Sequence, residues 1–152
     1  MTAALIILFV VAVALVPLVQ FMPSQRQRSI AGLREHAAIN GLFVEFRELP
    51  GRPEFRKQAG VTPGTVIYYG RRLPASTKDP RPSVQWQTHN GNWQPVGERR
   101  AVPAFSEPLP ASVLAAGFDE ASCGVYWVES DSTADVEVIC RVLEEWSQSL
   151  IQ

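Results

Sequence analysis

The sequence predicts an α+β protein: an N-terminal transmembrane helix, then a small, mostly antiparallel sheet with helices packed on one face. Three observations lead to this prediction. Residues 3–19 form an uncharged apolar run. Segments of alternating apolar and polar residues, one of them around Asn90-Gly91, indicate antiparallel strands. Two later stretches carry apolar residues at helical spacing. We therefore expect a transmembrane anchor at 1–23, a juxtamembrane helix at 24–41 and an α+β domain at 42–152.

The apolar run is long enough to cross a bilayer as a helix. With Gln20, Phe21 and Met22 it reaches about twenty residues, or roughly 30 Å. Twelve of the fifteen residues from Leu5 to Val19 are Leu, Ile, Phe or Val, which favours insertion by about 4 to 7 kcal/mol. A cleaved export signal is the alternative, and it would place the domain outside. The run lacks the basic start and the small cleavage-site residues of such a signal, so we expect an uncleaved anchor.

Three arginines follow the run closely: Arg26, Arg28 and Arg34. Positive residues beside a span stay on the cytoplasmic side. We therefore expect the N-terminus outside and the C-terminal domain in the cytoplasm. The same arginines are candidate membrane-surface residues, because each contributes about 1 kcal/mol near anionic lipid.

The juxtamembrane helix has start and stop signals of its own. Ser24 and Gln27 have the spacing of a capping box, after Pro23. Asn40-Gly41 is a C-terminal stop. The apolar face between these signals consists of Ile30, Leu33 and Ala37.

Five strands are expected in the domain, four of them before residue 97. The first covers 42–49, with Leu42, Val44 and Phe46 on one side, and the second covers 65–69. Residues 83–96 form a hairpin, because Asn-Gly is the preferred pair of a type I′ turn. In that register Trp86 opposes Pro95, and one face carries Val84, Trp86, Thr88, Trp93 and Pro95.

The C-terminal part continues the α+β pattern. Residues 110–116 predict a short helix, and residues 124–129 predict a strand with Val125 and Trp127 on one side. A final helix starts at Ser132 or Thr133, which are good N-caps. Its apolar stripe contains Val136, Ile139, Cys140, Leu143, Trp146 and Leu150.

Trp86 and Trp93 are the one pair of residues for which the sequence leaves two roles open. Two tryptophans on one hairpin face are usually core residues under a helix. They can also form an exposed partner-binding platform, since Trp is enriched at binding hot spots. The core role is favoured, above all for Trp86, which lies in mid-strand.

Charge is distributed unevenly although the net charge is −1. Residues 1–100 carry 13 Lys/Arg against 6 Asp/Glu, and residues 101–152 carry 1 against 9. The simpler explanation is that the two halves attract each other within one fold. The other is a basic face towards lipid and an acidic face towards a partner. Arg71-Arg72 and Arg99-Arg100 alone do not indicate nucleic-acid binding.

Catalytic, cofactor and metal motifs are not found. His36 and His89 have no Cys, Asp or Glu at ligand spacing. A nucleophilic pair of Cys123 with His89 stays open, whereas Cys140 is expected to pack in the core. Residues 60–64 (GVTPG) lack the lysine of a phosphate loop. We expect no catalytic, cofactor or metal site, although an enzyme with a site assembled from scattered residues is the alternative.

One segment carries a resemblance. It has a Pro-Ser-x-Arg-Gln-Arg start at Pro23, the pair Leu33-Arg34 and a Gly-Leu-x-Val motif from Gly41 to Val44. In this it resembles small single-span inner-membrane proteins of proteobacteria that lack an assigned function. The layout is also similar to that of the small auxiliary subunit of the bacterial Sec translocase, by architecture alone.

The predicted function follows from the layout. The resemblance implies a single-pass protein of the bacterial inner membrane. We expect a non-enzymatic accessory protein whose cytoplasmic domain binds another membrane or membrane-associated protein. Tethering to the bilayer raises the effective concentration for such a partner.

Overall fold

The computed structural model shows six strands, three helices around them and one helix apart. It describes residues 2–20, 24–51, 53–62, 64–76, 79–97, 100–105 and 107–151, without the side chains of 16–20 and 58. Residues 21–23, Pro63 and Arg99, on which predictions were made, lie outside this description. The helices are α1 (Thr2–Gln20), α2 (Gln25–Ile39), α3 (Pro53–Gln58) and α4 (Thr133–Ile151). The strands are β1 (Phe43–Glu45), β2 (Val66–Arg72), β3 (Val84–His89), β4 (Asn92–Val96), β5 (Val113–Phe118) and β6 (Ser122–Val128).

The strands form one antiparallel sheet in the order β1-β2-β6-β5-β3-β4. Strands β2, β6 and β5 occupy its centre, and β1 and β4 are its edges. A bulge between Val113 and Ala115 shifts the register of β5 against β6. This confirms the predicted α+β class and its antiparallel sheet.

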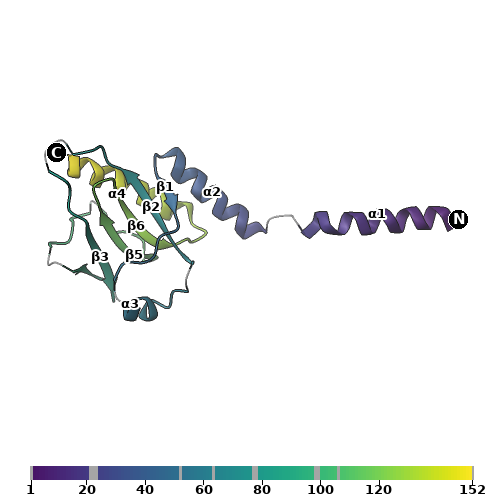
Figure 1. The fold of residues 1–152 in the computed structure, drawn as a ribbon, viewed down its shortest axis with the longest axis horizontal. Helices are drawn as coiled ribbons and strands as arrows, with labels where there is room; N and C mark the ends of the chain where they lie inside the picture. The colour runs from purple at the N-terminus through teal and green to yellow at the C-terminus, as the bar shows by residue number, and fades with distance from the viewer. Residues whose placement is uncertain are drawn as a thin grey trace.

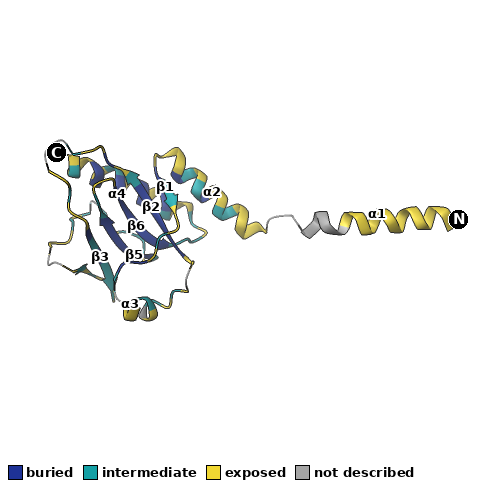
Figure 2. Cartoon of the chain, in the orientation of Figure 1, coloured by how far each residue is buried: buried dark blue, intermediate teal, exposed yellow. Residues whose placement is uncertain are grey.

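Helices α2 and α4 cover one face of the sheet (Figure 1). The main core lies between them and the inward residues of the strands, and Figure 2 shows it as the most buried part of the molecule. The predicted apolar stripe of α4 is buried from Val136 to Trp146, and Leu150 is half-buried. From α2, Leu33 and Ala37 reach this core, as the spacing predicted.

The opposite face of the sheet is covered by the segment between β1 and β2, which includes α3. Its smaller core gathers Leu49 and Phe55 against Val66, Tyr68 and Tyr126. The sequence predicted that all helices pack on one face of the sheet. That part of the prediction was wrong, because α3 lies on the other face. The six-residue α3 was missed because its short sequence has no apolar repeat.

Two glycines of the central strands make room for the ring of Tyr68 on this second face. A Cβ added to Gly124 would lie 2.6 Å from the Tyr68 hydroxyl oxygen, and one added to Gly70 would lie 2.6 Å from Cζ of Phe43. The ring therefore lies along the backbone, where its hydroxyl is 3.2 Å from Oγ of Ser122. Burial raises the pKa of Tyr68, so the phenol stays protonated.

The signals at the helix and hairpin ends are confirmed. Ser24 accepts from the N–H of Gln27, and the Gln27 side chain accepts from the N–H of Ser24. Gly41 has φ +78 after α2. In the hairpin, Asn90 (φ 49) and Gly91 (φ 79) form the turn, and Trp86 pairs with Pro95.

Two predicted elements differ from the structure. Residues 110–116 do not form a helix, because the chain from Val113 to Phe118 is a central strand between β3 and β6. The first strand ends at Glu45 and not at Leu49. Phe46 is therefore not on the buried side with Leu42 and is 70% exposed.

Helix α1 projects away from the sheet and the other helices in Figure 1. Its nine large apolar side chains between Leu5 and Leu15 are 47–70% exposed. Among the residues that the structure describes, no helix combines the length and apolar character needed to cross a membrane.

Candidate membrane-side and partner-binding surfaces

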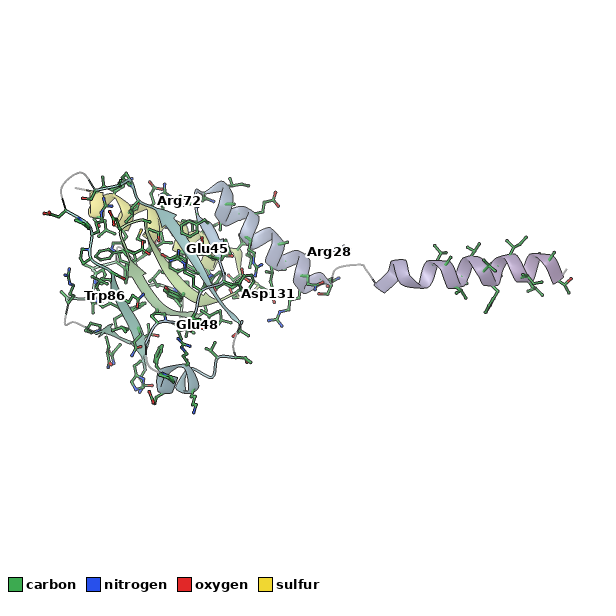
Figure 3. The ribbon with its side chains drawn as sticks, viewed as in Figure 1. Arg28, Glu45, Glu48, Arg72, Trp86 and Asp131 are labelled. Carbon is green, nitrogen blue, oxygen red and sulfur yellow. The ribbon has the colours of Figure 1, made fainter. Side chains whose placement is uncertain are left out.

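The three arginines predicted at the membrane surface do not have the same environment. Arg26 and Arg28 lie exposed in the first turns of α2. Figure 3 shows Arg28 near the start of α2, on the side from which α1 extends. Both lie at the end of α2 nearest α1 in the sequence, and their predicted role at a membrane surface stays a prediction.

Arg34, in contrast, is bound within the domain. Its Nε and Nη2 donate to the two carboxylate oxygens of Glu129, at 2.8 and 2.7 Å. The Tyr69 hydroxyl donates to the same carboxylate at 2.8 Å. The Glu129 side chain is 7% exposed and that of Arg34 34%. This bidentate pair ties α2 to the loop after β6.

The electrostatics of this cluster follow from its geometry. The hydrogen bond to Glu129 raises the pKa of Arg34. Burial, with the hydrogen bond to Glu129, raises the pKa of Tyr69. Both groups therefore keep their protons. Arg34 therefore differs from Arg26 and Arg28, because its charge is paired with a carboxylate distant in sequence.

Trp86 belongs to the core. It is 3% exposed, and its ring centroid lies 6.0 Å from that of Phe118 and 6.1 Å from that of Trp146 on α4. Its indole N–H donates to the carbonyl of Arg100 at 3.4 Å. The ring is buried under a helix, as expected for a mid-strand position, so it offers no surface to a partner.

Trp93 lies on the edge strand β4 and is half-buried. Its ring packs on Phe105 with centroids 5.7 Å apart, and Phe105 packs in turn on Trp146. One side of Trp93 therefore joins the core and the rest remains accessible. Of the two tryptophans, Trp93 is the one that can contact a partner.

The edge strand itself carries a feature that restricts pairing. In the observed register, Trp93 and Pro95 oppose Thr88 and Trp86. In a two-residue hairpin, the residues at these positions point their backbone N–H and C=O groups away from β3, towards the open edge. Pro95 has no N–H to donate there, which weakens β4 as a template for a further strand. A partner at this edge is therefore expected to contact side chains.

The open possibility of a Cys123–His89 pair is not supported. Cys123 is fully buried in the core on the α4 side. His89 lines a groove of about 800 Å³ with Gln87 and Phe55, on the α3 side. Burial also raises the pKa of Cys123 to about 12, so this thiol is not a nucleophile near neutral pH.

A second histidine–cysteine combination occurs between α2 and α4. His36 and Cys140 line a groove of about 420 Å³, with Glu137, Arg141 and Glu144. Burial raises the pKa of Cys140 to about 11. In the described part of the chain, no three His, Cys, Asp or Glu side chains could hold a metal ion. The burial of Cys140 confirms its predicted packing role.

A pocket beside Phe46 was missed by sequence reasoning. Its volume is about 310 Å³, and its apolar lining includes Leu49, Val61 and Val66. Arg47 and Arg56 also line it. Phe46 was expected on a buried strand face, so its exposure could not be foreseen. The partner of Arg34 was missed for another reason: 95 residues separate it from Glu129.

No protein-family profile, curated protein or solved structure matches this chain.

Proposed function

We propose that this chain is a non-enzymatic accessory protein tethered to the bacterial inner membrane, with its α+β domain in the cytoplasm. In this proposal residues 1–23, which extend past the described part of α1, form a single-pass anchor. The domain binds another membrane or membrane-associated protein. The observation that carries the proposal is the exposure of α1, where nine large apolar side chains have no protein surface to cover them. Extended apolar surfaces of this kind mark contact with lipid or protein.

The sequence around α1 adds support for the anchor. The apolar run continues in the sequence from Leu15 to Val19 without a charge. Arg26 and Arg28 follow it, exposed. Burying a large apolar side chain yields about 1.5 to 3 kcal/mol, so a helix of this composition is strongly favoured in lipid over water.

Extraction of membranes at alkaline pH tests the anchor. We expect the wild-type chain to stay in the pellet. A Leu8→Arg/Val11→Arg variant should move to the supernatant, because each charge in mid-bilayer costs about 2.5 to 3.5 kcal/mol. Leu8→Ala/Val11→Ala, which removes bulk without adding charge, should remain in the pellet. Release of the wild-type chain would contradict the anchor.

The partner-binding part of the proposal is supported by Trp93, a half-buried aromatic residue on an edge strand. A photo-crosslinking amino acid at Asn92, exposed beside Trp93, should capture a defined membrane-associated protein in intact cells. The same amino acid at Gln148, exposed on α4, is the control and should not capture it. Equal capture at both positions would argue against a binding surface at the hairpin.

A further inference from the structure

The Phe46 pocket combines an apolar floor with two guanidinium groups and one carboxylate. It is defined here by Phe46, Arg47, Glu48, Leu49, Arg56, Val61 and Val66. Its volume of about 310 Å³ is at the lower end of typical ligand sites. Phe46 stands beside it, 70% exposed. An exposed aromatic side chain next to an apolar pocket is suited to an amphiphilic ligand.

The arginines of this pocket are held in place by neighbouring groups. The guanidinium of Arg47 lies 4.0 Å from the ring centroid of Tyr68 and donates to Glu45 at 2.8 Å. Its Nη1 also lies 3.8 Å from a carboxylate oxygen of Asp119. Arg56 donates to the carbonyl of Leu49 at 3.1 Å and pairs with Glu48 at 3.1 Å. The Glu48 side chain is 84% exposed, so this surface pair is weak. A guanidinium has more N–H donors than these contacts use, which leaves capacity for a phosphate.

The pocket lies at the end of the domain nearest α1. Val66 begins β2 and pairs with Val128, next to Glu129. Glu129 binds Arg34 of α2, and the Arg34 guanidinium lies 5.5 Å from the ring centroid of Phe46. Figure 3 shows Arg28 and Asp131 at this same end, with Glu48 lower and nearer the middle of the domain. Phe46 is therefore placed near the chain segment that leads to the anchor.

The contact with Arg34 places Phe46 within a few helical turns of the start of α2. Arg34 lies nine residues from the start of α2, or about 14 Å along the helix axis. If α2 stands upright, Phe46 remains about this far from the end of the helix. Contact of the ring with the headgroups therefore requires that α2 tilts towards the membrane plane.

We propose that the Phe46 pocket binds the anionic headgroup and adjoining acyl region of a membrane phospholipid. The arginines bind the phosphate, and Phe46 with the apolar floor contacts the acyl region. This inference rests on the anchor of the proposed function, which keeps the pocket beside the bilayer. It gives the domain a second contact with the membrane, distinct from Arg26 and Arg28.

Quenching of tryptophan fluorescence by brominated lipid tests this proposal. Full-length Phe46→Trp is reconstituted in vesicles of brominated phosphatidylcholine, with and without phosphatidylglycerol. The matched control is Ile39→Trp, at a residue 78% exposed on α2 but about 140° around the helix from Arg34. The native Trp86, Trp127 and Trp146 are buried, and the native background is common to both variants.

We expect the added tryptophan of Phe46→Trp to be quenched when phosphatidylglycerol is present, and that of Ile39→Trp to be unaffected. Equal quenching of the two variants would overturn the proposal. Quenching of Phe46→Trp that is just as strong in phosphatidylcholine alone would show that the pocket does not require an anionic headgroup. Arg56→Gln in the Phe46→Trp background should weaken the apparent affinity for phosphatidylglycerol about fivefold. Arg141→Gln, at an exposed residue of α4, should leave it unchanged.

Flotation of the same vesicles separates the two proposals. A wild-type chain that does not float with the lipid would contradict the anchor itself. A chain that floats while Phe46→Trp and Ile39→Trp are quenched alike would leave the anchor intact and overturn the lipid pocket alone.

Discussion

At the scale of single residues, the Arg34–Glu129 pair connects α2 to the sheet. Removing Arg34 leaves a carboxylate that is 7% exposed without its cation, although the Tyr69 hydroxyl still donates to it. We expect Arg34→Ala to lower the free energy of unfolding by about 1 to 3 kcal/mol. Unfolding of fragment 24–152 in guanidinium, followed by tryptophan fluorescence, measures this.

Arg28→Ala is the matched control for that substitution. It removes the same charge from the same helix, but the side chain is exposed. Its effect should stay within about 0.5 kcal/mol. Similar losses for Arg28→Ala and Arg34→Ala would show that the ion pair does not stabilise the fold.

The two cysteines make the stability of the domain sensitive to alkaline pH. Burial raises the pKa of Cys123 to about 12 and that of Cys140 to about 11. A cysteine with a raised pKa in the folded state makes its full contribution to the free energy of unfolding below its pKa in the unfolded chain, which is about 8.5. This contribution is lost as the pH rises through the pKa in the folded state. Stability should therefore fall above about pH 9.

Denaturation curves recorded at several alkaline pH values measure this slope. Cys123→Ala should reduce the slope of unfolding free energy against pH by up to about 1.4 kcal/mol per pH unit. This is the slope that the release of one proton on unfolding produces. In the folded protein, neither thiol should react with a thiol reagent at neutral pH. Rapid labelling of Cys123 would show that it is not buried as described.

At the scale of elements, the β3–β4 hairpin depends on its turn. Gly91 has φ +79, and a Cβ added there would meet no atom within 4 Å. The cost of Gly91→Val therefore comes from the backbone conformation, which a β-branched residue resists. We expect a loss of about 1 kcal/mol or more in thermal unfolding of fragment 24–152.

Gly32→Ala is the matched control for Gly91→Val. It adds a side chain where there is equally free space, but we expect it not to destabilise the protein. Gly32 lies inside α2, and an added Cβ there also meets no atom within 4 Å. Alanine is the better helix former by about 1 kcal/mol, so this variant should be at least as stable as the wild type. A stable Gly91→Val variant would argue against the type I′ turn.

The elements that the sequence predicted correctly are those with local signals. The capping box from Ser24 to Gln27 and the pair Asn90-Gly91 act through neighbouring backbone groups, so their geometry is determined by a few residues. The segment 110–116 was predicted wrongly for the complementary reason. Its Ala and Leu residues favour a helix locally, but pairing with β3 and β6 makes it a central strand.

At the scale of the whole molecule, ion pairs join the basic and acidic parts of the chain. Arg34 pairs with Glu129, and Arg71 pairs with Glu144 on α4. Arg47 lies 3.8 Å from Asp119. This supports the simpler of the two explanations for the charge asymmetry, attraction within one fold. The pattern of charge along the sequence predicted the attraction, but not which residues meet.

The candidate sites were predictable only in part for the same reason. Arg26, Arg28 and Trp93 follow from local sequence, and their side chains are exposed or half-buried. The Phe46 pocket arises because β1 ends early and the following segment crosses to the second face of the sheet. Long-range packing of this kind has no periodic signal in the sequence.

Topology is the property of the whole chain that the arginines should control. If the chain inserts into the membrane as proposed, the domain is not yet folded during insertion. Arg34 then has no Glu129 partner, and all three arginines count as positive charges. A fluorescent protein fused after Gln152 should therefore be active, and alkaline phosphatase at the same position inactive.

Replacing all three arginines by glutamine and adding lysines after Thr2 should reverse this pattern in part of the molecules. Arg71→Gln/Arg72→Gln, far from the span, is the control and should change nothing. Alkaline phosphatase activity from the wild-type fusion would place the domain outside, as expected for an exported protein with a cleaved signal.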